Sequence, residues 1–120
     1  MAIKKHYVNN KDLYAAMIQF KEDVDKAHQE NKPLPQIPNY VGICFMLICN
    51  KLSTKPNFMN YSYRDDMIAD GIENCVAAAH SFDPSKSNNP FGYFTQIAWN
   101  AFIRRIAKEK KQSYIKHKNF

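Results

Sequence analysis

Glycine, cysteine and histidine are scarce in this sequence, with three, three and four residues in 120. The glycines are isolated, which excludes the glycine-rich loops that bind phosphate groups. The cysteines, Cys44, Cys49 and Cys75, and the scattered histidines lack the paired spacing of a zinc or catalytic site. We therefore expect inert core thiols, no metal, no cofactor and no enzymatic activity.

The sequence also lacks long hydrophobic runs. No stretch reaches the length that spans a bilayer, and the first residues lack the apolar run and cleavage site of a secretory signal. With 45% hydrophobic residues, a chain of this length can bury one core. We expect a single helical domain over residues 1–120, in a soluble protein of the cytoplasm that does not bind membranes.

The formal net charge is +6, and the charges are segregated along the chain. Residues 104–118 carry seven basic side chains and a single acid, Glu109. Residues 65–73 carry four acids and no base. A basic segment is typical of proteins that bind nucleic acids, and an acidic segment suits a basic protein surface. Charge alone leaves open that both are ordinary solvated helix faces.

Apolar residues recur every three or four positions, which indicates an all-α fold, a compact bundle of about four helices. The first helix falls within residues 9–31, begins after Asn9 or Asn10 and ends near Gln29. Its apolar stripe is Leu13, Met17, Phe20, Val24 and Ala27. Three prolines within residues 32–38 end it and form an extended linker. Residues 39–120 form the remaining core, with a basic C-terminal helix.

The second helix, about residues 39–52, is apolar on nearly every side, so we expect it in the middle of the packing. The third helix begins near Ser62 and has Asp65 and Asp66 in its first turn, where the helix dipole favours negative charge. The expected buried stripe is Ile68, Ile72, Cys75, Val76 and Ala79. The residues left on its outward face are Asp66, Ala69, Asp70, Glu73 and Ala77.

The fourth helix begins at Asn89 and Pro90, a cap followed by a first-turn proline, and runs to about Ser113. Its expected core stripe is Phe94, Ala98, Ala101, Phe102 and Ile106. The opposite face carries Tyr93, Gln96, Asn100, Ile103 and Arg104, with Trp99 beside them and Arg105 and Lys108 following. Amides can read base edges, rings can stack on bases and cations can bind phosphates. Alternatively, the first helix half-buries the rings, and the amides simply face solvent.

Several strings resemble region 2 of bacterial sigma factors. They are Asp66-Met-Ile-Ala-Asp-Gly-Ile72, then Phe82-Asp83, then an aromatic-rich helix ending Arg104-Arg-Ile-Ala-Lys108. The spacing from the first string to the second fits without a gap. The strings YVNNKDL, MIADGIE, FD…NP…YFTQ and NAFIRRIAKE are similar to those of the late sigma factors of T-even-like bacteriophages.

This resemblance implies a sigma factor that binds the host RNA polymerase core and directs it to minus-ten-like late promoters, where it assists DNA melting. Asp66, Ala69, Asp70 and Glu73 would dock on the arginine-rich clamp helices of the largest polymerase subunit. Ala69 stands where the wider family has glutamine, which removes a side-chain hydrogen bond.

The resemblance also assigns promoter contacts to the fourth helix. Tyr93 corresponds to the melting tyrosine, Asn100 and Ile103 would face the upstream base pair, and Arg104 and Arg105 would touch the backbone. Lys108 continues this basic side.

Two tryptophans of the family are replaced by Gln96 and Ile97. Trp99 and Phe91 lie close enough in the sequence that one ring could substitute.

The phage family also relies on a late co-activator and on the sliding clamp, which binds a short acidic and hydrophobic C-terminal tail. Residues 114–120 are basic instead, so we expect that this tail is absent or truncated here. The alternative that the residues leave open is an autonomous helical module that binds DNA or RNA without polymerase.

Overall fold

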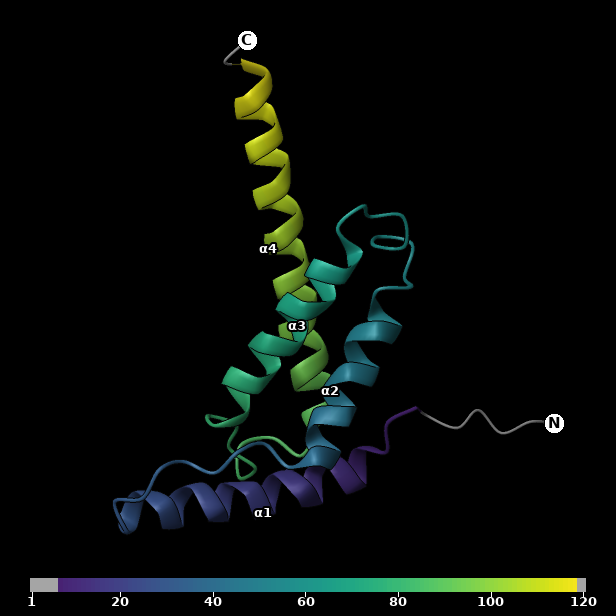
Figure 1. The fold of residues 1–120 in the computed structure, drawn as a ribbon. Helices are drawn as coiled ribbons and strands as arrows, with labels where there is room; N and C mark the ends of the chain where they lie inside the picture. The colour runs from purple at the N-terminus through teal and green to yellow at the C-terminus, as the bar shows by residue number, and fades with distance from the viewer. Residues whose placement is uncertain (1–6, 119–120) are drawn as a thin grey trace, which may run out of the picture.

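The structure, a computed structural model, describes the backbone of residues 7–118 and the side chains of residues 7–111. Its four helices are α1 (Asn10–Gln29), α2 (Asn39–Leu52), α3 (Arg64–Ala79) and α4 (Pro90–Lys118), and the described residues contain no strand. The predicted all-α fold is therefore confirmed. Figure 1 shows α1 lying across one end of the other three helices, and α4 extending beyond them at the opposite end. Within this described part, no helix has the length and apolarity to cross a membrane.

Helix α1 has the boundaries and the buried face that the sequence predicts. The Asn9 side chain accepts hydrogen bonds from the backbone N–H groups of Lys11 at 3.0 Å and Asp12 at 3.2 Å. At the other end, Asn31 adopts a left-handed conformation with φ 54°, and the Lys32 N–H donates to the Ala27 carbonyl at 2.9 Å. All five residues of the predicted stripe are buried.

The core lies where α2, α3 and α4 meet above α1, and aromatic rings join its parts. Phe45 of α2 packs on Phe94 of α4 with ring centroids 4.5 Å apart. Phe58, from the loop after α2, contacts Phe102 at 5.2 Å. These rings are at most 1% exposed, and burial of each contributes about 1.5–3 kcal/mol.

Helix α2 has the predicted bounds, but the prediction that it lies in the middle of the packing is wrong. Tyr40, Ile43, Met46 and Leu47 are all exposed, and Ile43 and Met46 are more than half exposed. Only one flank of α2 is covered, because α3, α4 and α1 all pack against the face that carries Val41, Phe45 and Ile48.

The buried face of α3 is rotated from the predicted one. Cys75 and Ala79 are buried, as predicted, together with Met67 and Gly71. Ile68, Ile72 and Val76, which the sequence also predicts to be buried, are half-buried. The helix begins at Arg64 without a side-chain cap, rather than at a Ser62 cap. The rotation arises because Gly71 lets α3 approach its neighbours closely, as the glycine contacts described below show.

Helix α4 begins as predicted, since the Asn89 side chain accepts a hydrogen bond from the Gly92 N–H at 3.1 Å. Four residues of its predicted stripe are buried, and Ile106 is half-buried. The helix continues to Lys118, beyond the predicted end near Ser113.

Helix α1 holds the start of α4 in place. The Asn10 side chain accepts a hydrogen bond from the Phe91 N–H at 3.0 Å, and the Tyr14 hydroxyl donates to the Pro84 carbonyl at 2.9 Å. The loop before α4 and the first turn of α4 are therefore fixed to the rest of the fold.

We predict that Gly71→Ala destabilises the protein by about 1–3 kcal/mol, the usual range for overpacking a core. A Cβ at this position would lie 2.7 Å from the Phe102 ring and 2.9 Å from the Cys49 sulfur. Urea unfolding followed by circular dichroism measures the change in free energy.

The matched control is Gly42→Ala, because a Cβ at Gly42 in the middle of α2 would meet nothing within 4 Å. Alanine should stabilise the helix there by about 0.5–1 kcal/mol. Equal effects of the two substitutions would contradict the close packing of α3.

Candidate functional site

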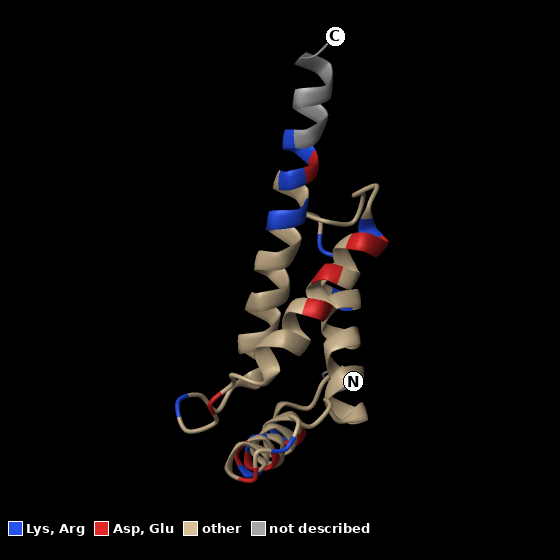
Figure 2. Ribbon diagram, turned by 60° about the vertical axis from the view of Figure 1, so that its left-hand side comes forward, with Lys and Arg blue, Asp and Glu red and all other residues tan. Residues whose placement is uncertain are grey.

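One candidate surface lies on the outward side of α3. Asp66, Ala69 and Glu73 are exposed, as the sequence predicts, and Asp65 is exposed beside them. We call these four residues the acidic face. None of the ion pairs among the described residues involves its carboxylates. Figure 2 shows acidic positions along α3 and basic positions gathered farther along α4.

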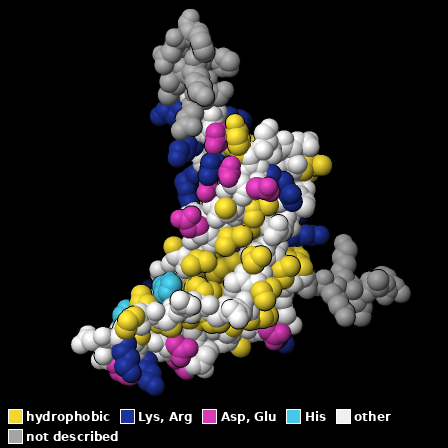
Figure 3. All heavy atoms as spheres, viewed as in Figure 1, with side chains coloured by type: hydrophobic (Ala, Val, Ile, Leu, Met, Phe, Trp, Pro, Cys, Tyr) yellow, Lys and Arg dark blue, Asp and Glu magenta, His cyan; other side chains and the backbone are white. Residues whose placement is uncertain are grey.

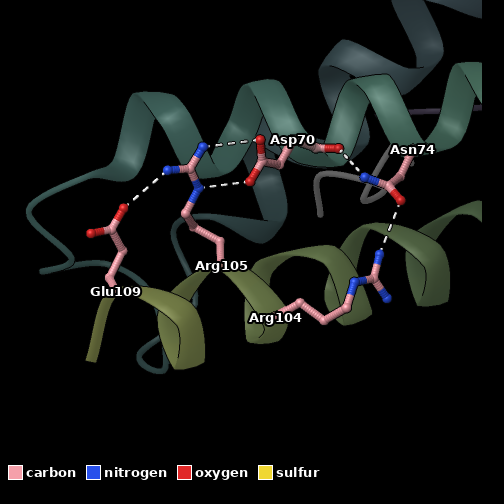
Figure 4. Close-up of polar contacts among 5 residues, drawn as sticks. All are labelled: Asp70, Asn74, Arg104, Arg105 and Glu109. Carbon is pink, nitrogen blue, oxygen red and sulfur yellow. Dashed lines mark hydrogen bonds and ion pairs between the residues drawn. The ribbon is translucent and has the colours of Figure 1, made fainter. Parts of the chain in front are cut away.

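Asp70 differs from its neighbours because its carboxylate is bound within the protein. Its oxygens accept hydrogen bonds from the Arg105 Nε at 2.7 Å and Nη2 at 3.2 Å (Figure 4). The Arg105 Nη1 also donates to Glu109 at 3.0 Å. Hydrogen bonds to Asp70 and then Glu109 raise the pKa of Arg105 above its ordinary value. The expectation that Asp70 is displayed on the outward face of α3 is therefore corrected: its carboxylate binds Arg105, the residue that the resemblance places against the DNA backbone.

The adjacent arginine has a neutral partner. The Arg104 Nη2 donates to the Asn74 Oδ1 at 3.0 Å, and the Asn74 Nδ2 donates to the Asp70 carbonyl at 2.7 Å (Figure 4). Arg104 is exposed, and among the described residues it takes part in no ion pair.

The second candidate surface is the outward side of α4. Tyr93, Gln96, Asn100, Ile103 and Arg104 are all exposed, and we call these five residues the α4 face. The Gln96 Nε2 donates to the Asn100 Oδ1 at 3.0 Å, which links one turn of this face to the next. Lys108 is exposed one turn farther along.

The Tyr93 ring packs against two other rings and is 37% exposed. Its centroid lies 5.0 Å from that of Phe82 and 5.1 Å from that of Phe94, and both contacts are edge-on. A shallow pocket beside it is lined by Phe82, Lys86 and Ser87 among others. The adjoining turn is held by Asp83, whose pKa is lowered by hydrogen bonds from Ser85.

Trp99 and Phe91, the other two rings considered as DNA contacts, pack against rings within the protein. Trp99 is half-buried and meets Phe58 edge-on at 4.9 Å. Phe91 is half-buried and meets Tyr7 at 5.7 Å. The expectation that Trp99 stands beside the exposed row is corrected, because the loop after α2 covers it. Phe58 was not predicted as a core residue, because it lies in a loop and gives no periodic signal.

An apolar surface that was not predicted from the sequence borders the acidic face. Figure 3 shows hydrophobic side chains gathered over α2 and α3, with acidic side chains along their edge. On α2 the most exposed are Ile43, at 54%, and Met46, at 51%. On α3 the half-buried Ile68, Ile72 and Val76 lie on the flank away from Asp70. We call these five residues the apolar band.

The three cysteines are free and buried, as expected. A hydrogen bond with Cys49 and burial raise the pKa of the Cys75 thiol. No group of three potential metal ligands occurs among residues 7–111. The basic segment 114–120, which bears on the sliding-clamp prediction, lies outside the residues whose side chains are described.

Residues 57–112 match the family model of Sigma-70 region 2. The matched segment contains α3, the following loop and the described side chains of α4, and therefore both the acidic face and the α4 face. A comparison with curated proteins gave no match.

We predict that Asp70 and Arg105 are energetically coupled. Asp70→Asn and Arg105→Gln should each lower the melting temperature, and the double variant should melt close to the single variants, because either change already breaks the pair. Thermal melts at low and high salt measure this coupling.

The exposed pair of Lys21 and Asp25, 3.2 Å apart on α1, is the control. Exposed pairs at this helical spacing contribute little, so Lys21→Gln and Asp25→Asn should be nearly additive. Coupling of the α3–α4 pair no larger than that of the control would contradict this prediction.

Proposed function

We propose that this chain is a sigma-type subunit that binds the core of bacterial RNA polymerase and assists promoter opening. The match of residues 57–112 to Sigma-70 region 2 supports this function. The observation that carries the proposal is the display of two unlike surfaces on adjacent helices. The acidic face lies on α3, and the α4 face, which is polar and aromatic, lies on α4.

On this proposal the polymerase core binds the acidic face together with the apolar band. Exposed carboxylates such as Asp66 and Glu73 orient a basic partner and speed its association more than they add affinity. The apolar band supplies area that is removed from water on binding. Asp70 is not part of this contact, because its carboxylate is already bound to Arg105.

The α4 face would contact promoter DNA. Gln96 and Asn100 offer amide groups for base edges, and Tyr93 offers an exposed ring on which an unpaired base can stack. Such stacking contributes about 1–3 kcal/mol per base. The half-buried Trp99 would contribute through the shape of α4 rather than through stacking.

We further propose that the promoters are minus-ten-like late promoters of a T-even-like bacteriophage, and that the partners include a late co-activator and the sliding clamp. The support is the similarity of the four strings described above. Residues 114–120 are basic, unlike the acidic tail through which that family binds the clamp.

Transcription in vitro tests the function. Host core polymerase is combined with A/T-rich late-type promoter templates, with and without this protein, and transcripts are mapped at their 5′ ends. We expect a product with a defined start only when the protein is present. Tight, salt-steep binding to duplex DNA without polymerase, and no defined start, would instead favour an autonomous nucleic-acid-binding module.

We predict that Asp66→Lys combined with Glu73→Lys weakens core binding by roughly tenfold or more, about 1.4 kcal/mol, because lysines would face basic groups of the partner. The affinity is measured with labelled protein and purified core polymerase. Both positions are exposed, so the melting temperature should change little.

The control variant, Glu22→Lys with Asp23→Lys, makes the same change in net charge on the exposed side of α1. It should bind the core nearly as well as the original chain. If both double variants weaken core binding equally, the change in net charge explains the loss of affinity, and the acidic face is not the docking site.

A further inference from the structure

We propose that Asn74 is a positioning residue that holds Arg104 ready for a DNA phosphate without compensating its positive charge, and that Arg105 stabilises the fold and does not contact the DNA. This inference rests on the proposed function, because it assigns different tasks to two adjacent arginines of the DNA-binding helix.

The two arginines differ in their partners. The Arg105 side chain is 24% exposed and is bound by the carboxylates of Asp70 and Glu109. Arg104 is exposed, and its hydrogen bond goes to the amide oxygen of Asn74. Neighbouring positions on a helix point in different directions, so Arg105 faces α3 directly while Arg104 lies at the edge of the α4 face.

The partners determine how much positive charge each arginine offers. Two carboxylates beside Arg105 more than compensate its single positive charge. A phosphate approaching Arg105 would also meet Asp70 and Glu109, which repel it. Asn74 carries no charge, so it does not compensate the positive charge of Arg104.

Arg104 also keeps most of its donors. A guanidinium has five N–H groups, and the Asn74 contact uses one of them. The remaining donors can form the paired hydrogen bonds that arginine makes with phosphate oxygens. Holding the side chain in one place beforehand lowers the entropy lost on binding.

The orientation of Asn74 is fixed from its own helix. Its Nδ2 donates to the carbonyl of Asp70, four residues earlier on α3, which directs the Oδ1 toward α4. Aspartate at this position would lack that donor and would compensate the positive charge of Arg104. Asparagine can accept a hydrogen bond from Arg104 without adding a negative charge beside it.

The experiment compares promoter binding by the complex of core polymerase with each variant, across a range of salt concentrations. The variants are Arg104→Gln, Arg105→Gln, Asn74→Ala and Asn74→Asp. Core binding and the melting temperature are measured first for each, so that a folding or docking defect is recognised separately.

Arg104→Gln should lower the slope of log affinity against log salt by about one, the value expected for one lost phosphate contact. Asn74→Asp should lower the slope similarly with little change in melting temperature, because the new ion pair with Arg104 offsets the lost hydrogen bond to the Asp70 carbonyl. Asn74→Ala should keep the slope and reduce affinity roughly three- to tenfold, since only the positioning is lost. Arg105→Gln should lower the melting temperature and leave the slope unchanged.

A normal slope with Asn74→Asp, or a reduced slope with Arg105→Gln in place of Arg104→Gln, overturns the inference while leaving the sigma-type function intact. Failure of the unaltered chain to bind core polymerase overturns the function and the inference together. The core-binding measurement distinguishes these two results.

Discussion

The close approach of α3 to α4 at Gly71 determines the geometry of both candidate surfaces. Any side chain at this position would collide with the Phe102 ring and the Cys49 sulfur, so the three helices α2, α3 and α4 meet where the glycine is. Asp70 directly precedes Gly71, and Asn74 follows by nearly one turn. The packing that buries Gly71 therefore also brings these two polar side chains within hydrogen-bonding distance of α4.

Because α3 and α4 pack this closely, an acidic side chain of α3 pairs with a basic side chain of α4. Asp70 belongs to the acidic segment and Arg105 to the basic one, yet each satisfies the other. What remains displayed is smaller and better separated: the acidic face on α3 and the α4 face with Arg104 at its edge. Helix α1 adds a constraint from the other end, because Asn10 and Tyr14 fix the start of α4, where Tyr93 lies.

The features that the sequence predicts well are local. The Asn9 and Asn89 caps depend on a few neighbouring residues, and the stripes of α1 and α4 follow from helical periodicity. The exposure of the α4 face follows from the same periodicity. These predictions needed no knowledge of what packs against each helix.

The features that could not be predicted from the sequence depend on tertiary contacts. The apolar side chains of α3 indicate a buried face with Ile68 and Ile72, because Gly71 has no side chain that contributes to such a pattern. In the structure the face that carries Gly71 is the buried one. The Asp70–Arg105 pair joins residues 35 positions apart, and no local pattern reports it. Phe58, which packs on Trp99, comes from a loop that has no helical pattern. One side of α2 is exposed because the other three helices all pack against its opposite side.

Trp99 and Phe91 are half-buried, which leaves less ring surface on α4 for stacking in the proposed mechanism. Among the described side chains of α4, Tyr93 is the most exposed aromatic ring, at 37%, so the proposed strand capture by stacking on this helix would depend mainly on Tyr93. One stacked base contributes about 1–3 kcal/mol, comparable to the stacking energy of one or two base-pair steps. Opening several base pairs therefore needs further stabilisation from the polymerase or from another factor. A sigma-type subunit built in this way would place the polymerase and mark the start of opening, and its dependence on partners would follow from how its own rings are packed.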